Sequence, residues 1–125
     1  MSKSLPPKIG WLNEVEEHDY PAAESYLNII YPTTQVKDVV KKLRVAPVVE
    51  FKAKDVFRAS GLSLLGVSNS HVAKDIKKIK KGKALSPLLL VRDTAIGKVV
   101  IADGYHRMCA IYKFNEDALI RCKIV

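Results

Sequence analysis

Cysteine, aromatic residues and long apolar runs are all scarce in this chain. It contains two cysteines among 125 residues, and aromatic residues make up 7% of it. Two cysteines are too few for a disulfide-stapled scaffold, and Cys109 and Cys122 lack the close spacing of a zinc site. We therefore predict two buried free thiols and no metal site. No apolar run approaches the roughly 18 residues of a membrane span, so no membrane partner is expected.

A targeting segment is also lacking. The first ten residues, MSKSLPPKIG, hold no apolar stretch of the kind that marks a secretory signal. We therefore expect a cytoplasmic protein. Hydrophobic residues make up 48% of the chain and charged residues 27%, which suits a single soluble domain over residues 1–125.

Acidic residues are outnumbered, with 13 against 21 basic ones, so the net charge is +8. A basic balance of this size favours anionic partners. Much of it lies in six lysines within one ten-residue stretch, Lys74, Lys77, Lys78, Lys80, Lys81 and Lys83. The cluster indicates a nucleotide, a nucleic acid or an acidic protein as partner, or simply a solvated helix face.

Apolar periodicity and capping residues predict an α+β protein. Residues 1–46 are expected to form an arm, fixed by Trp11 and Leu12, and a helical hairpin that begins at an Asp19 cap. This hairpin would be a lid, a dimerisation element or a cover for the sheet. Residues 47–125 are expected to form the core, with a packed loop over 62–67 and an antiparallel strand pair around the turn 93–97. The expected helices span 20–31, 35–44, 54–60, 70–81 and 105–114, and the expected strands span 48–52, 88–92, 98–102 and 119–125.

Residues 99–112, VVIADGYHRMCAIY, form the most informative stretch. An apolar run stops at Asp103 and Gly104, and His106 and Arg107 then fall in the first turn of an expected helix. A helix N-terminus carries unpaired backbone N–H groups and the positive end of the dipole, so basic side chains are unfavourable there. A bound phosphate resolves this conflict, and the pattern therefore predicts an anion site.

In this hypothesis the residues of the motif 103–107 have functional roles, and simpler alternatives exist for them. Arg107 would bind phosphate through two parallel hydrogen bonds, or it is a surface arginine paired with Asp103 or Glu116. His106 would donate to phosphate, or it is structural. Gly104 serves the turn through a positive φ and allows a ligand to approach the backbone closely.

Two neighbours leave several roles open. Asp103 would cap the helix, orient Arg107 or hold a metal that bridges phosphates. Tyr105 would stack on a base or pack against the protein.

The segment Asp-Gly-Tyr-His-Arg-Met-Cys-Ala resembles the signature of the ParB/sulfiredoxin superfamily over about residues 47–125. Partition ParB proteins have a Gly-x-Arg-Arg type motif there, sulfiredoxins have Gly-Gly-Cys-His-Arg, and ParB-like free serine kinases have Asp-Gly-His-Thr-Arg. The resemblance implies a small mixed sheet packed with helices and a motif that holds nucleotide phosphates at the start of a helix. The expected cofactor is a nucleotide of the ATP or CTP class, with Mg²⁺ as a helper if the protein is an enzyme.

In the resembled folds, the helix before the strand pair contributes polar side chains to the nucleotide. Here that helix would direct His71, Lys74 and Lys78 toward the ligand, with Ser68 and Asn69 near the phosphates at its start. The other lysines of the cluster would point to solvent.

Departures from the family narrow the function. The sulfiredoxin cysteine is replaced by Tyr105, and Cys109 lies one turn further on a face expected to be buried, so sulfiredoxin activity is not expected. Partition proteins carry a helix-turn-helix domain for which we expect no room before Val125. The serine kinases need an acidic base. Glu50 is the nearest candidate by position, and Asp103 is a second candidate.

The sequence therefore predicts a domain that binds a nucleotide or another phosphorylated ligand. If it is an enzyme, we expect phosphoryl transfer or phosphate-ester hydrolysis. An Arg107→Ala variant is expected to weaken binding more than tenfold at an unchanged melting temperature. The alternatives are a nucleic-acid-binding or nuclease-like module that uses the basic helix 74–83, and a protein-interaction module with a degenerate pocket that uses the hairpin 20–44.

Overall fold

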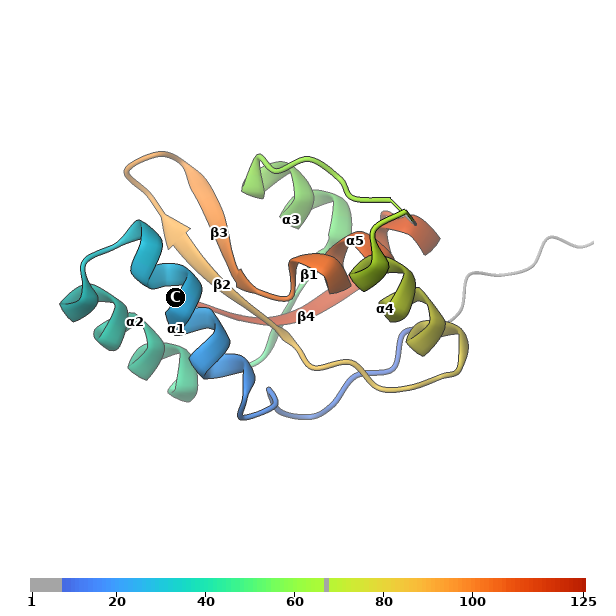
Figure 1. Cartoon of the computed structure of the whole chain (residues 1–125), viewed down its shortest axis with the longest axis horizontal. Helices are drawn as coiled ribbons and strands as arrows, with labels where there is room; N and C mark the ends of the chain where they lie inside the picture. Colours follow the sequence, from blue (N-terminus) through green and yellow to red (C-terminus); the bar gives the residue numbers. More distant parts are fainter. Residues whose placement is uncertain (1–7, 67) are drawn as a thin grey trace, which may run out of the picture.

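A computed structural model of the chain describes residues 8–66 and 68–125. The predictions for residues 1–7 and for Val67 lie outside these ranges. The described part confirms the α+β class (Figure 1). None of its helices is both long enough and apolar enough to cross a membrane. Its elements are α1 (Asp19–Ile30), α2 (Thr33–Val45), β1 (Val49–Lys52), α3 (Ala53–Ser60), α4 (Ser70–Lys80), β2 (Leu88–Asp93), β3 (Lys98–Asp103), α5 (Tyr105–Phe114) and β4 (Leu119–Ile124).

Most element ends follow from local chemistry. Gly61 ends α3 in the left-handed region at φ +66°. The Asn69 side chain caps α4 by accepting the backbone N–H groups of His71 and Val72 at 3.0 and 3.2 Å. The predicted Asp19 cap is wrong, because α1 begins at Asp19 itself and the preceding His18 makes no side-chain cap. The Asp19 carboxylate is used elsewhere, as described below.

The four strands form one mixed sheet in the order β1-β4-β2-β3. β1 and β4 run antiparallel, β4 and β2 parallel, and β2 and β3 antiparallel as predicted. On the central strand β2, Leu88 and Leu90 face one apolar core, and Leu89 and Val91 face a second core on the other side of the sheet. Burial on both faces explains why this strand reads as an unbroken apolar run.

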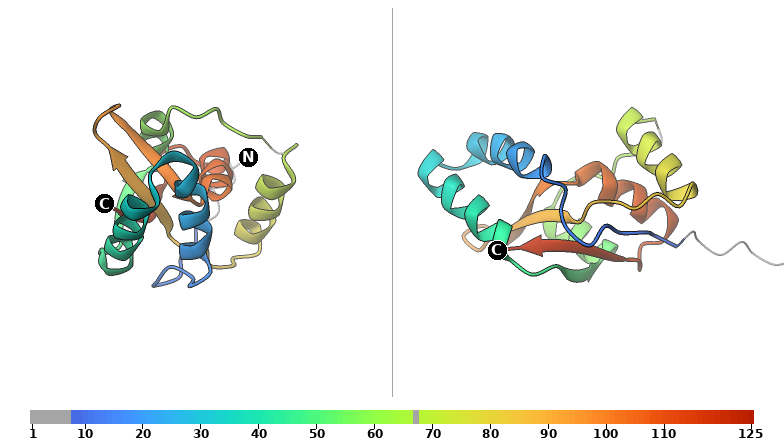
Figure 2. Two further views of the ribbon diagram at one scale, coloured as in Figure 1. Left: turned by 60° about the vertical axis from the view of Figure 1, so that its left-hand side comes forward. Right: turned by 90° about the horizontal axis from the view of Figure 1, so that it is seen from below.

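The N-terminal hairpin covers one face of the sheet (Figures 1 and 2). Leu27 of α1 and Val36 and Leu43 of α2 are fully buried there. Lys123 of β4 reaches into the hairpin, where its Nζ donates to the Tyr20 hydroxyl at 3.1 Å and to a carbonyl of α2 at 2.9 Å. Of the three roles considered for the hairpin, the described contacts are those of a cover for the sheet.

The opposite face of the sheet is covered by α3 and α5, and α4 packs against α5. Val72, Ile76 and Ile79 form the buried stripe of α4, as their helical spacing predicts. Because this stripe contacts α5, the neighbouring face of α4 lies beside the first turn of α5. This packing determines which side chains can share a site with the motif.

The segment before α1 pairs with the residues that precede β2. Trp11 forms a parallel bridge with Leu85, and the backbone N–H of Leu12 donates to the Leu85 carbonyl at 2.9 Å. The predicted anchoring by Trp11 and Leu12 is therefore confirmed. Anchoring here carries the residues that follow, including Asp19, to the start of β2 and the motif.

Candidate functional site

Gly104 forms the junction between β3 and α5. Its φ is +101°, a left-handed conformation that suits glycine, and its carbonyl accepts the first helical hydrogen bond, from Met108 N, at 2.9 Å. A Cβ at this position would lie 2.6 Å from Cγ of Leu88 and 2.8 Å from Nη2 of Arg107. The glycine is therefore needed both for the turn and for the position of the arginine. As the N-cap residue, Gly104 has no side chain with which to cap α5.

The Arg107 side chain lies between two carboxylates. Its Nη2 donates to Asp103 Oδ2 at 2.8 Å and its Nη1 to Asp19 Oδ2 at 3.3 Å. Only 14% of the Arg107 side chain and 6% of the Asp19 side chain are exposed. Asp19 Oδ2 also accepts the buried Ser86 hydroxyl at 2.6 Å. The guanidinium thus joins α1, β3 and α5 through its two terminal nitrogens, while its Nε is buried with no hydrogen-bond partner among the described residues. Its contact with a phosphate stays a prediction.

Of the roles considered for Asp103, the structure shows the orientation of Arg107, through the hydrogen bond to its carboxylate. It does not show Asp103 as the cap of α5. Burial raises the pKa of the Asp103 carboxyl above its ordinary value, Arg107 opposes this rise and Asp19 adds to it. Glu116, the other acid considered for Arg107, instead accepts the Tyr112 hydroxyl at 3.4 Å. The ion pair is therefore a buried feature of the fold.

A polar cavity of about 260 Å³ opens beside this ion pair. It contains residues from three separate parts of the chain, brought together by the packing of α4 on α5 and of α1 over β3. Most of the residues singled out from the sequence meet here. The cavity is lined by Glu16, His18, Asp19, His71, Lys74, Asp75, Lys78, Asp103, Gly104, His106 and Arg107. We call it the polar pocket.

Two histidines form a pair within the polar pocket. The ring centroids of His71 and His106 lie 4.8 Å apart. The pKa of His106 is lowered by its burial, and the neighbouring His71 and Arg107 lower it further, while Asp75 opposes them. The His106 ring is therefore held neutral down to a lower pH than an ordinary histidine, and an anion beside it would reverse this effect.

Three predicted residues lie away from the polar pocket. Ser68 is exposed in the turn before α4 and Asn69 uses its side chain as the α4 cap, so neither lines the cavity. Glu50 is exposed on β1 at the edge of the sheet, in register with Arg121 of β4. Its candidacy as a base is corrected by this position, because β1 contributes no residue to the cavity.

The thiols are as inert as the sequence predicts. Cys109 and Cys122 are buried and unpaired. Burial raises the pKa of Cys109, and it raises the pKa of Cys122 to about 12. Both thiols thus stay protonated at neutral pH.

An apolar cavity of about 280 Å³ adjoins the polar pocket and shares Asp103, Gly104 and His106 with it. We call it the aromatic pocket, because Tyr26 of α1 and Tyr105 of α5 contribute to its wall. The Tyr105 hydroxyl donates to the Ser63 carbonyl, which fixes the ring against the loop after α3. Its other lining residues are Ala22, Leu62, Ile101 and Ala102.

Sequence reasoning missed the contribution of the N-terminal segment. Asp19 looks like a helix cap in the sequence, and nothing local marks Glu16, His18 or Tyr26 as neighbours of a motif more than seventy residues away. The sequence offers one general signal. A buried acid needs a partner, so an acid that follows the anchored Trp11 is a candidate partner for Arg107.

The residues do not fit a resident Mg²⁺ ion. Asp19 and Asp103 already accept hydrogen bonds from Arg107 and Ser86. Within residues 8–66 and 68–125, no group of three or more His, Cys, Asp or Glu side chains is arranged to hold a metal. No chemical step is therefore assigned to Mg²⁺.

No protein-family model, curated protein or solved structure matches the chain. Its function is therefore argued from the two pockets and the residues that form them.

Proposed function

We propose that this chain is a ParB/sulfiredoxin-like domain that binds a nucleotide or another phosphorylated small molecule. The observation that carries the proposal is the polar pocket, in which Lys74 and Lys78 of α4 lie with the uncapped start of α5. Backbone N–H groups and the positive dipole end attract an anion there. The two ammonium groups add charge on the opposite wall.

The residues divide into those that touch the ligand and those that position them. Lys74, Lys78, His71 and His106 have side chains on the pocket wall and would contact phosphate oxygens directly. Arg107 is a positioning residue, because both of its terminal nitrogens are already hydrogen-bonded to carboxylates. It fixes the first turn of α5 against α1, and with it the direction of the backbone N–H groups.

The aromatic pocket favours a nucleotide over inorganic phosphate. It continues from the polar pocket across Gly104 and His106 and is mainly apolar. Tyr26 and Tyr105 provide aromatic surface on which a base packs, while the phosphates remain with the lysines. A ligand that fills both pockets thus has a charged end and a flat, less polar end.

Phosphoryl transfer or phosphate-ester hydrolysis needs a general base that is free to accept a proton. Asp103 is paired with Arg107 and Glu50 lies outside the pocket. Asp75 of α4 is the pocket carboxylate with no hydrogen bond or ion pair to any described side chain. It replaces the two earlier candidates, and hydrolysis of the bound nucleotide in the wild type and in Asp75→Asn tests the assignment.

A Lys74→Ala/Lys78→Ala double variant is expected to bind ATP, CTP or pyrophosphate at least tenfold more weakly than the wild type, a loss of about 1.4 kcal/mol or more. The physical reason is the loss of two charges on the pocket wall. The matched control is Lys77→Ala/Lys80→Ala, which removes the same charge from exposed positions of the same helix. Isothermal titration calorimetry with each ligand, with and without Mg²⁺, measures the affinities.

The control variant is expected to change affinity less than twofold, because neither lysine lines the polar pocket and salt screens charges that are exposed to solvent. Equal losses in the two variants would show general attraction to a basic protein and would overturn the proposal. Absence of binding by the wild type at millimolar ligand would do the same.

Ligand binding is also expected to change the titration of His106. Its pKa is lowered in the free protein, and an anion in contact with the ring stabilises the protonated form, so the pKa should rise on binding. By linkage, affinity increases as the pH falls through the interval between the two pKa values. NMR titration of the histidine ring protons, with and without saturating pyrophosphate, measures both values. An unchanged pKa under saturation would place the anion away from His106.

Nucleic-acid binding is the second candidate, favoured by exposed lysines at the C-terminal end of α4: Lys77, Lys80, Lys81 and Lys83. The same two double variants separate the candidates. Nucleic-acid binding would be favoured if the wild type binds an oligonucleotide in a salt-sensitive way, the Lys77→Ala/Lys80→Ala variant does not, and the wild type binds no mononucleotide. If neither ligand binds, the protein-interaction hypothesis remains.

A further inference from the structure

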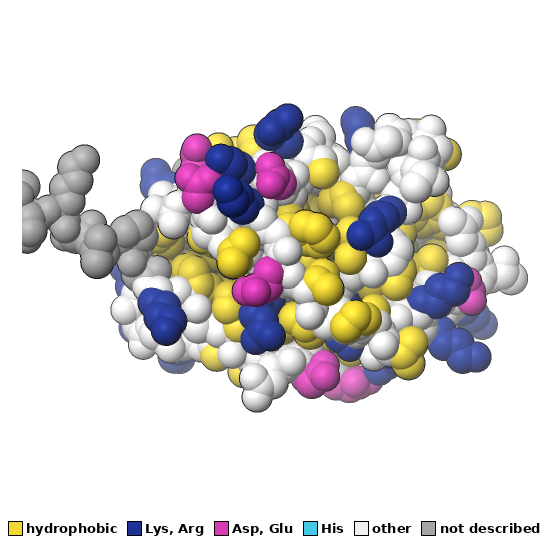
Figure 3. Space-filling model, turned by 180° about the vertical axis from the view of Figure 1, so that it is seen from behind, with side chains coloured by type: hydrophobic (Ala, Val, Ile, Leu, Met, Phe, Trp, Pro, Cys, Tyr) yellow, Lys and Arg dark blue, Asp and Glu magenta, His cyan; other side chains and the backbone are white. Residues whose placement is uncertain are grey.

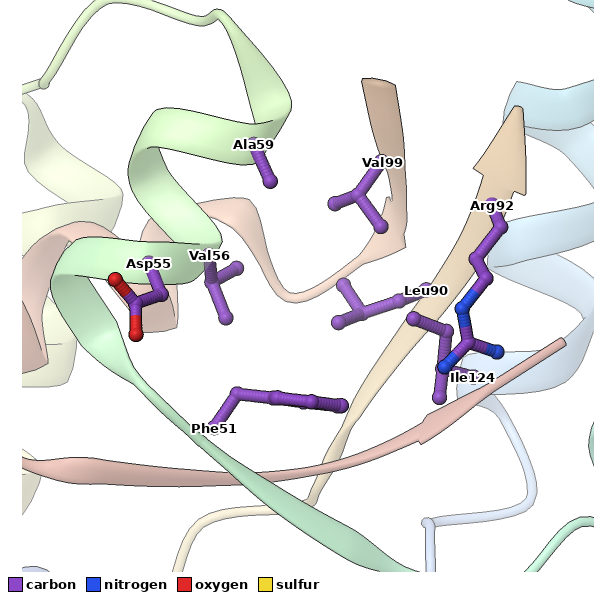
Figure 4. A pocket seen from close by; sticks show the side chains of 8 residues that line it. All are labelled: Phe51, Asp55, Val56, Ala59, Leu90, Arg92, Val99 and Ile124. Atoms are coloured by element: carbon purple, nitrogen blue, oxygen red, sulfur yellow. The ribbon is translucent and has the colours of Figure 1, made fainter. Parts of the chain in front are cut away.

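A third cavity, of about 230 Å³, lies between α3 and the face of the sheet (Figure 4). It shares no lining residue with the polar pocket. Its floor is apolar, and Leu90 and Val56 in it are almost completely buried, whereas the Phe51 ring on its β1 side is 37% exposed. We call it the α3 groove. The remaining lining residues are Asp55, Ala59, Arg92, Val99 and Ile124.

The α3 groove has a cation at one end and an anion at the other. In Figure 4 the Arg92 side chain lies at one end, over the side of Leu90 and Ile124, and Asp55 lies at the opposite end beyond Val56. Within the described ranges, the Arg92 guanidinium forms no ion pair or side-chain hydrogen bond. A carboxylate is the group whose planar geometry matches a guanidinium.

From this arrangement we infer that the α3 groove is a second binding site, which takes a small monocarboxylate with an apolar body. The body lies on Leu90, Val99 and Ile124, and the carboxylate meets Arg92. The groove is large enough, since an apolar cavity of about 150 Å³ holds a benzene ring and the groove has a volume of about 230 Å³. The exposed Asp55 carboxylate at the other end repels a second anionic group, so a dicarboxylate of similar length is expected to bind more weakly.

The surface around the groove is consistent with a small ligand. Hydrophobic side chains gather over the middle of the face that Figure 3 shows, with basic and acidic side chains among them. The inference is independent of the phosphate site, because no residue contributes to both cavities.

The test uses phenylacetate as ligand and phenylacetamide as its neutral match, with binding measured by ligand-observed NMR and calorimetry on the full chain. Saturable binding of phenylacetate at least tenfold tighter than the amide is expected. Arg92→Gln should remove this preference, whereas Arg58→Gln, an exposed arginine of α3 outside the groove, should keep it. Ala59→Leu, which fills the groove, should abolish binding of both molecules.

Backbone chemical-shift mapping of the wild type keeps the inference testable if a variant unfolds. Shifts that centre on Val56, Ala59 and Val99 support it, and shifts that centre on Lys74 and His106 overturn it. Competition by pyrophosphate would likewise overturn it, because the carboxylate would then occupy the polar pocket. Three further outcomes would contradict the inference. The acid and the amide could bind with equal affinity, or neither could show saturable binding at millimolar concentration. An acidic apolar peptide could bind while no free acid does.

Discussion

Replacing Arg107 by Gln is expected to lower the free energy of unfolding by about 3 kcal/mol, with a fall in Tm on the order of 10 °C. The arginine lies between Asp19 and Asp103, whose side chains are 6% and 22% exposed. Removing it leaves two carboxylates close together with no compensating charge. The structure therefore replaces the sequence-based expectation of an unchanged melting temperature. Urea denaturation at pH 7 measures the loss.

The loss of unfolding free energy caused by Arg107→Gln is expected to be smaller at acidic pH. Burial already raises the pKa of Asp103 above its ordinary value, while Arg107 holds it down. Without Arg107 the folded-state pKa lies still higher than the unfolded-state pKa of about 3.9. The folded variant then binds more protons than the unfolded chain, so its stability rises as the pH falls from 7 toward 4. A deficit that is the same at both pH values would contradict this account.

A triple variant provides the control for the ion pair. Asp19→Asn and Asp103→Asn, combined with Arg107→Gln, remove all three charges and leave similar shapes. Because the cost comes from unpaired buried charge, the triple variant should recover most of the stability that Arg107→Gln loses. A triple variant as unstable as the single one would show that packing of the arginine stem, and not charge, is what matters.

Gly104→Ala is expected to cost about 2–5 kcal/mol, through two separate effects. A left-handed backbone costs a non-glycine residue roughly 1–2 kcal/mol. The added Cβ also meets Leu88 Cγ at 2.6 Å and Arg107 Nη2 at 2.8 Å, and such overpacking costs about 1–3 kcal/mol. Leu88 is fully buried and cannot move aside freely. The variant should also bind phosphate more weakly, since the arginine that fixes α5 is displaced.

Gly97→Ala is the matched control for this glycine. Its φ is +64°, and a Cβ there has no atom within 4 Å, so only the backbone term applies. We expect a loss of about 1 kcal/mol for Gly97→Ala. The difference between the two variants in urea denaturation measures the steric part at Gly104. Equal losses would mean that the contact with Leu88 relaxes without cost.

The secondary structure and the motif helix follow closely from local signals. The helix after Gly104 spans Tyr105–Phe114 as predicted, and Gly61 and Asn69 bound their helices with the expected chemistry. These features are local, because a cap or a left-handed glycine acts within a few residues. The shared placement of His71, Lys74 and Lys78 on the pocket wall also follows from helical spacing.

The predictions that required knowledge of distant partners were incomplete. Asp19 was expected to cap a helix and instead binds Arg107, 88 positions away in the chain. Glu50 was considered for the site because of its strand, but β1 lies at the opposite edge of the sheet from β3, which leads into the motif. Neither outcome is encoded near the residue concerned, because each depends on which segments pack together.

Local chemistry was thus sufficient for the α+β class, the ends of most elements and the position of the motif 103–107 at a strand-to-helix turn. The order of the strands, the covering of the sheet by the hairpin and the pairing of Arg107 with two carboxylates were decided only by tertiary packing. The reason is physical. Propensity and capping act over a few residues, whereas a buried charge takes whichever partner the folded chain brings within about 3 Å.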